Sequence, residues 1–149
     1  MQKGISCHGY KLLAMKYDTK LIGLVTVFEN VTKARVKDAF LDRREVLVFV
    51  VEEGDGGKAI GKMGNTVRRV STLMRRRIRI IEFNNDVIEF VKNVIDPVKD
   101  VAITKENDSV IIKPKDTQTK GLLVGRERSN INEVNLIVKK FFKVDVKVS

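Results

Sequence analysis

The sequence predicts an α+β protein that contains two copies of one small unit, each with the element order helix-strand-strand-helix-helix-strand. The first observation is an internal repeat, since a shift of 64 residues places Gly61 on Gly125 and Lys62 on Arg126. The second is that each copy has short runs rich in β-branched residues, followed by a glycine-containing turn and an apolar stripe at helical spacing. The third is length, because 149 residues can hold two such units.

The first copy is expected to begin with a helix at 19–30, because four of its apolar residues share one helical face. These residues are Leu21, Leu24, Val25 and Phe28. The elements that follow are strands near 31–38 and at 45–52, a short helix ending at Gly61, a helix from about Asn65 to Arg76 and a strand at 78–83. Three arginines, Arg75 to Arg77, are expected in the last turn of the longer helix, where cations oppose the macrodipole.

The second copy is expected to begin with the helix "NNDVIEFVKNVI" at 84–95, with Asn84 or Asn85 as its N-cap and Asp96-Pro97 as its stop. The elements that follow are strands near 98–104 and 109–115, a short helix at about 118–124, a helix at 130–142 and a strand at 144–148.

The predicted domain organisation is an N-terminal tail at 1–17, a first domain at 18–84 and a second at 85–149. No linker rich in glycine, serine or proline separates the two copies. Units of about 65 residues bury only roughly 60% of their chain surface and are marginal alone. We therefore expect the two to pack as one rigid body.

The charge of the chain is strongly positive and local. Twenty-nine lysines and arginines against 19 acidic residues give a formal net charge of +10. Eight basic residues and no acidic one lie from Lys58 to Arg79, and six basic residues against two acidic ones lie from Lys120 to Lys143. Such an excess favours polyanions, with nucleic acid ahead of an anionic membrane surface.

Other features of the sequence indicate a cytoplasmic protein without a membrane partner. The longest apolar run, at 46–51, is too short to cross a bilayer, and no secretory signal pattern is present. The single cysteine, Cys7, cannot form an intramolecular disulfide, which suits a reducing compartment.

Three interpretations compete for the stretch "GDGGKAIGKMGNT" at 54–66. A nucleotide-binding P-loop fits Gly56, Gly61 and Lys62, but Met63 stands where a hydroxyl must hold magnesium. A simple turn between two helices explains one glycine and leaves the surrounding charge unexplained. A helix–GxxG–helix clamp for single-stranded nucleic acid explains both glycines and the charge, because the missing Cβ atoms let a sugar-phosphate backbone approach closely.

Two stretches then resemble a known family. "GGKAIGKMGNTVRRVSTLMRRRIRIIEF" is similar to the core of a KH domain, and "TKGLLVGRERSNINEVNLIVKKFFKVDVKV" is similar to a second one. The element order is that of the type II KH arrangement, and the tandem, over about 18–148, resembles the archaeal NusA-like transcription factors. The resemblance implies a protein that binds RNA emerging from RNA polymerase and modulates elongation, pausing or termination. It implies single-stranded RNA as a partner and RNA polymerase as a second one.

In the first copy the clamp assigns a role to each candidate RNA-binding residue. Two glycines admit the RNA backbone, Lys62 reaches phosphate, three other cations add charge, and apolar side chains line a groove for bases. The residues are Lys58, Ile60, Gly61, Lys62, Met63, Gly64, Val67, Arg68 and Arg69.

The second copy departs from this pattern, and its candidate residues are Lys120, Gly125, Arg126 and Arg128. Arg128 stands where the family has its second loop glycine, and Glu127 adds a charge that repels phosphate. Either the arginine side chains hold phosphate, or this copy has become mainly a structural partner. The excess of cations favours weakened but surviving binding.

No enzyme, cofactor or metal site is expected. Cys7 and His8 adjoin, but the chain has no other cysteine or histidine to complete a metal site. The acidic residues Glu52, Glu53 and Asp55 are interpreted as a solvated turn. Two other functions stay open: a ribosome- or translation-associated KH protein, and an adaptor whose basic face binds an acidic protein.

Overall fold

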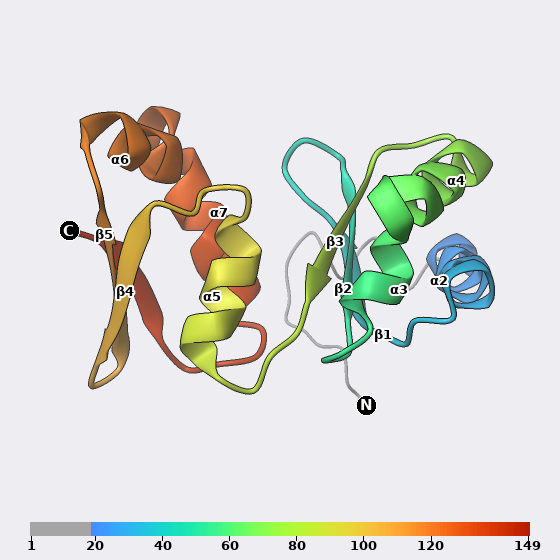
Figure 1. Ribbon diagram of the computed structural model, residues 1–149, viewed down its shortest axis with the longest axis horizontal. Helices are drawn as coiled ribbons and strands as arrows, with labels where there is room; N and C mark the ends of the chain where they lie inside the picture. Colours follow the sequence, from blue (N-terminus) through green and yellow to red (C-terminus); the bar gives the residue numbers. More distant parts are fainter. Residues whose placement is uncertain (1–18) are drawn as a thin grey trace. The chain divides into compact units, whose positions relative to one another are not determined.

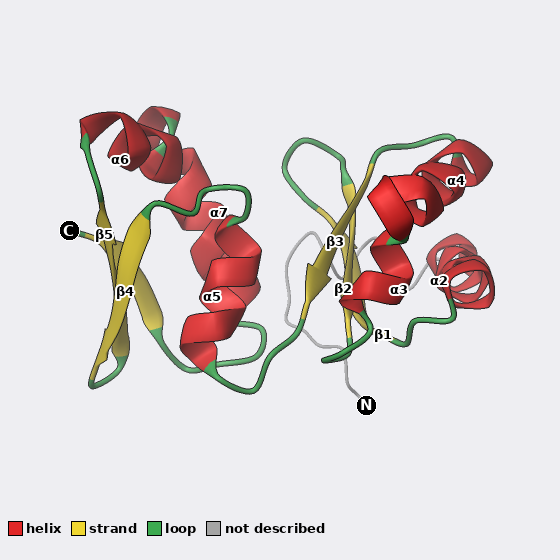
Figure 2. Cartoon of the chain, in the orientation of Figure 1, coloured by secondary structure: helices red, strands yellow, loops and turns green. Residues whose placement is uncertain are grey.

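The computed structural model describes residues 19–149, which divide into two compact units between Phe83 and Asn84 (Figure 1). Each unit contains a three-stranded mixed sheet with helices packed on it (Figure 2). The predicted α+β class and the repeated element order are confirmed. The predicted tail at 1–17, with Cys7 and His8, lies outside the described residues. That the units form one rigid body stays a prediction.

The first unit has a sheet with the strand order β1-β2-β3, in which β1 is antiparallel and β3 parallel to β2. Its elements are α2 (Thr19–Thr32), β1 (Val36–Leu41), β2 (Leu47–Val51), α3 (Gly56–Ile60), the 3₁₀ turn η1 (Lys62–Gly64), α4 (Asn65–Met74) and β3 (Ile78–Glu82).

The core of the first unit forms where α2 and α4 meet the central strand. All five residues of β2 are buried, as its β-branched and aromatic composition predicts. Phe28 of α2 stacks on Phe49 of β2, with ring centroids 4.0 Å apart. Leu21 and Val70 belong to the same buried cluster. The helical face proposed for α2 is therefore the one that packs on the sheet.

The second unit repeats the topology with the strand order β4-β5-β6. Its elements are α5 (Val87–Ile95), β4 (Val101–Glu106), β5 (Ser109–Pro114), α6 (Thr117–Val124), the 3₁₀ turn η2 (Arg126–Arg128), α7 (Ser129–Val138) and β6 (Asp145–Val148). Within residues 19–149, none of the helices combines the length and apolar character that a bilayer crossing requires.

Two helix ends in the second unit differ from the sequence prediction. The N-cap of α5 is Asp86, whose carboxylate accepts from the Ile88 amide at 3.0 Å, and not Asn84 or Asn85. Helix α7 ends at Val138, four residues early, since the chain then turns to bring both Phe141 and Phe142 against Phe90.

Helix α4 also ends earlier than expected, at Met74. Arg75 takes a left-handed conformation there, with φ 54° and ψ 43°, and its amide donates to Thr72. Arg75, Arg76 and Arg77 therefore follow the helix in a loop and do not fill its last turn.

Candidate nucleic-acid interface

The loop at 61–64 turns the chain sharply between α3 and α4. Gly61 ends α3 at φ 77° and ψ 171°, and Gly64 begins α4 in the left-handed region at φ 76° and ψ 13°. Met63 between them is also left-handed, at φ 54° and ψ 29°. The turn is closed by the Gly64 amide, which donates to the Gly61 carbonyl at 3.1 Å. Three residues with positive φ in four explain why the sequence places glycines here.

The two glycines are required for different reasons. A Cβ on Gly61 would overlap the hydroxyl of Thr66 and lie 2.8 Å from its amide nitrogen. A Cβ on Gly64 would meet only an Arg68 guanidinium nitrogen, at 3.5 Å, which is ordinary contact. Packing within the unit therefore demands a bare residue at 61, whereas at 64 only the backbone conformation favours glycine.

Cations surround the open side of this loop. The side chains of Lys62, Arg68 and Arg69 are exposed. Arg68 donates to the Asn65 side-chain oxygen at 2.7 Å, and this bond holds its guanidinium beside Gly64. No side chain caps the start of α4, and its first turn has no acidic residue. The loop thus presents bare main chain, a helix start and positive charge together, which is the chemistry that phosphate requires.

Apolar side chains lie on the same stretch of chain. Met63 is 84% exposed and Ile60 is 44% exposed, although both are large and apolar. Val67, in the first turn of α4, is half-buried. These positions suit the contacts with unstacked bases that the sequence predicted, and that role stays a prediction.

Lys58 has a partner inside the protein. Its ammonium lies 3.5 Å from the Asp55 carboxylate, which is buried and also accepts from the Arg35 amide at 2.9 Å. This amide bond, helped by Lys58 and the Arg35 side chain, lowers the pKa of Asp55. The interpretation of Asp55 as part of a solvated turn is therefore wrong, because its carboxylate joins Arg35, the residue before β1, to the start of α3.

The second loop, at 125–128, has nearly the same backbone as the first. Gly125 has φ 73° and ψ 175°, Glu127 has φ 55° and ψ 32°, and Arg128 has φ 63° and ψ 22°. The Arg128 amide donates to the Gly125 carbonyl at 3.2 Å. A Cβ on Gly125 would lie 2.6 Å from the amide carbon of Asn130. The turn therefore survives although an arginine replaces its second glycine, which the sequence pattern alone did not indicate.

The surroundings of the second loop differ in charge. Lys120, Arg126 and Arg128 are exposed, as a phosphate contact requires. The positions that match Arg68 and Arg69 are Asn132 and Glu133, and the exposed Leu122 matches Lys58. The second loop therefore keeps the backbone shape and loses most of the flanking cations. The 64-residue register of the repeat is the signal that identifies these matched positions.

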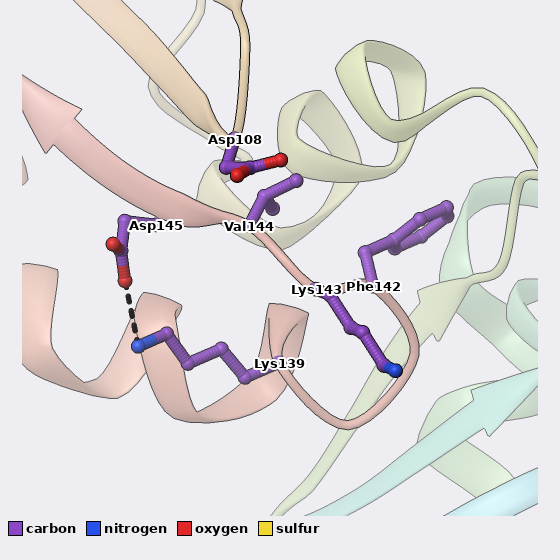
Figure 3. Close-up of a pocket in the computed structure, with 6 residues that line it drawn as sticks. All are labelled: Asp108, Lys139, Phe142, Lys143, Val144 and Asp145. Atoms are coloured by element: carbon purple, nitrogen blue, oxygen red, sulfur yellow. Dashed lines mark ion pairs between the residues drawn. The ribbon is translucent and has the colours of Figure 1, made fainter.

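A shallow hollow of about 340 Å³ lies elsewhere in the second unit, between the β4–β5 turn and the segment joining α7 to β6 (Figure 3). Its lining residues are Asp108, Lys139, Phe142, Lys143, Val144 and Asp145. Lys139 and Asp145 form an ion pair of 2.7 Å, and the hydrogen bond from Lys139 lowers the pKa of Asp145. The hollow contains none of the predicted RNA-binding residues, and across residues 19–149 no cluster of acidic, cysteine or histidine side chains could hold a metal ion.

Comparisons with known proteins agree with the resemblance seen in the sequence. No family model matches the chain. It is 42% identical over 59 residues to "Probable transcription termination protein NusA" of Methanococcus vannielii, a match that spans 40% of this chain and about a third, 34%, of that protein. It is also similar to the crystal structure of APE1850, with 26% identity and a TM-score of 0.63 over 85% of this chain and 95% of that one. The chain is thus similar in sequence to an archaeal NusA and similar in fold to a solved protein over most of its length.

Proposed function

We propose that this protein binds single-stranded RNA on the loop at 61–64 and acts as a NusA-type factor in transcription. One observation carries the RNA proposal. Gly64 is bare although the protein itself leaves room for a side chain there, and exposed cations flank it. A surface left open beside fixed positive charge suits an anionic chain that approaches from outside.

Each part of the loop has a task in this proposal. The ribose-phosphate backbone lies against Gly64, and phosphate oxygens accept from the uncapped start of α4. Lys62 and the guanidinium of Arg68 supply charge, since hydrogen bonds to charged groups are the stronger ones. Ile60 and Val67 receive unstacked bases. A clamp of this kind holds about four nucleotides.

The transcription part of the proposal is supported by the relative from Methanococcus vannielii, whose name states transcription termination. Nascent RNA is then the natural ligand, and RNA polymerase is the second proposed partner. Co-purification with polymerase supports this assignment, whereas co-purification with ribosomal particles supports the translation alternative. Complexes that survive RNase treatment with no bound RNA contradict both and favour an acidic protein as partner.

The clamp is tested by Gly64→Asp, which places a carboxylate where phosphate is expected and leaves the loop conformation accessible, since Asp tolerates a left-handed backbone. We expect the affinity for a single-stranded RNA of about 12 nucleotides to fall at least roughly tenfold, which corresponds to about 1.4 kcal/mol. Fluorescence anisotropy measures it.

The matched control is Gly23→Asp. Gly23 is exposed on α2, and nothing lies within 4 Å of a Cβ added there. The control makes the same charge change far from the loop in sequence, so it should leave affinity within about twofold, in the range of surface substitutions. Equal losses of RNA affinity in the two variants would show that the change in net charge causes the loss, and would contradict the clamp.

A further inference from the structure

A second group of cations lies at the other end of α4. We define the arginine cluster as Arg44, in the β1–β2 turn, with Arg75, Arg76 and Arg77 in the loop between α4 and β3. Arg76 is half-exposed and the other three are exposed. Helix α4 has ten residues, so about 15 Å separates this cluster from the loop at 61–64.

Hydrogen bonds fix the two loops of the cluster against each other. The guanidinium of Arg77 donates to the Arg44 carbonyl at 3.1 Å, and the Arg77 carbonyl accepts from the Leu47 amide at 3.0 Å. The Ser71 hydroxyl donates to the Arg76 carbonyl at 2.7 Å. The cluster is therefore a fixed feature of the sheet end where β2 and β3 begin (Figure 1).

The charge of the cluster is not neutralised within the described part of the chain. Within residues 19–149, none of its four arginines forms an ion pair with a carboxylate. Two acidic residues lie in the same β1–β2 turn. Asp42 uses its carboxylate to accept from the Arg44 and Val46 amides at 2.8 and 2.9 Å, and Glu45 is exposed. Arginines held together without carboxylate partners repel one another, and an anionic ligand relieves that repulsion.

Arg75 adds independent support. It occupies the left-handed position after α4, at φ 54°, where glycine or asparagine is favoured. A long side chain there strains the backbone, and local rules are broken in this way at functional sites. Arg75 thus places a guanidinium at a position where the backbone conformation favours glycine or asparagine.

We propose that the arginine cluster is a second phosphate-binding site, which holds RNA that continues past the segment bound at residues 61–64. The inference rests on the proposed RNA function and adds a second contact to it. Arginine suits this role because its planar fork of donors matches phosphate oxygens in pairs. The expected ligand is one RNA strand long enough to run along α4.

The test is a length series of RNA on the full chain, with about 4, 8 and 12 nucleotides. We expect wild-type affinity to rise with length, and Arg75→Gln/Arg76→Gln/Arg77→Gln to remove most of that rise while leaving tetranucleotide affinity within about twofold. For the longest RNA, the slope of log affinity against log salt should shrink by about 0.7 for each phosphate that the variant no longer neutralises. Thermal unfolding checks that the variant stays folded.

The matched control is Lys99→Gln/Lys105→Gln/Lys113→Gln, which removes the same charge from three exposed residues of the second unit. An unchanged length series in the arginine variant overturns the second site, and so does an equal loss for all lengths, which would make the cluster part of the clamp. A loss of the same size in the lysine control also overturns it. Failure of the clamp itself is recognised separately, since Gly64→Asp would then leave tetranucleotide affinity unchanged.

Discussion

The loops at 61–64 and 125–128 trace nearly the same backbone while they carry different side chains. The first residue of each is a glycine near φ 75°, and the last is left-handed, although it is Gly64 in one loop and Arg128 in the other. Each first glycine also faces a side chain five residues ahead, Thr66 or Asn130, that leaves no room for a Cβ.

This comparison separates shape from chemistry. The shape of the turn is set by the first glycine and the polar side chain that packs against it, because both copies keep the glycine and have such a side chain five residues ahead. The fourth position and the flanking charges vary between copies without changing the backbone. Ligand binding can therefore differ between the two units while the fold does not.

The largest expected effect tests this separation through stability. Gly61→Ala forces a Cβ onto Thr66 and an alanine into a φ/ψ region that essentially only glycine occupies, so it should destabilise the protein by about 2–3 kcal/mol. Gly64→Ala meets no steric conflict and should cost about 1 kcal/mol, from the left-handed conformation alone. Urea unfolding measures both.

The same pair of substitutions distinguishes the copies. Gly125→Ala should behave like Gly61→Ala, since its Cβ would collide with Asn130. If Gly64→Ala proves as costly as Gly61→Ala, the fourth position also sets the shape of the turn, and the interpretation of Gly64 as a surface left open for a ligand fails.

A smaller effect is expected when the cations of the second loop are removed. Arg126→Gln/Arg128→Gln should weaken RNA binding by about two- to fivefold, because few other cations flank this loop and exposed charges interact weakly. Lys62→Gln/Arg68→Gln, which removes two cations beside the first loop, should weaken it by roughly tenfold or more. Anisotropy titrations at one salt concentration compare them. Equal losses of RNA affinity would show that side chains alone hold phosphate in both loops and that the missing side chain at Gly64 contributes little.

The element order of the fold could be predicted from the sequence because its signals are local. Apolar spacing placed α2, and β-branched runs placed β2 and β5, within a few residues of their observed bounds. The end of α7 could not be predicted in this way. Phe141 and Phe142 continue the apolar pattern, but they leave the helix to pack on Phe90, about fifty residues earlier in the chain.

The site shows the same limit. Its glycines and cations are adjacent in sequence, so the candidate site residues could be predicted from the sequence motif. The bond between Asp55 and the Arg35 amide joins residues twenty positions apart, and no local signal marks it. The left-handed conformation of Arg128 could not be predicted from the residue itself either, since arginine rarely adopts it. Only its match to Gly64 under the repeat indicates it.

The smallest effect concerns the turn before the short helix in each unit, where Asp55 and Asp116 act differently. Asp55 is buried and accepts from the amide of Arg35, just before β1, whereas Asp116 is exposed and caps α6 by accepting from the Thr119 amide at 2.7 Å. These amide bonds lower the pKa of each carboxyl below its ordinary value of 3.8. A depressed folded-state pKa adds stability that is complete above the unfolded value and is lost as the pH falls through the folded one. Both contributions should therefore begin to fall below about pH 4 and be lost once the pH is below the folded-state pKa values.

The two units should respond unequally to Asn at these positions. Asp55→Asn should flatten the acid side of the stability profile more than Asp116→Asn, because Asp55 also faces Lys58 and Arg35 at 3.5 and 3.7 Å. Urea unfolding between about pH 3 and 6 measures this, and the carboxyl resonances of the two residues give their pKa values directly. A profile that Asp116→Asn flattens as much as Asp55→Asn would mean that a single amide bond dominates at both sites. The bond between Asp55 and the residue before β1 would then add nothing to acid stability beyond what an exposed helix cap provides.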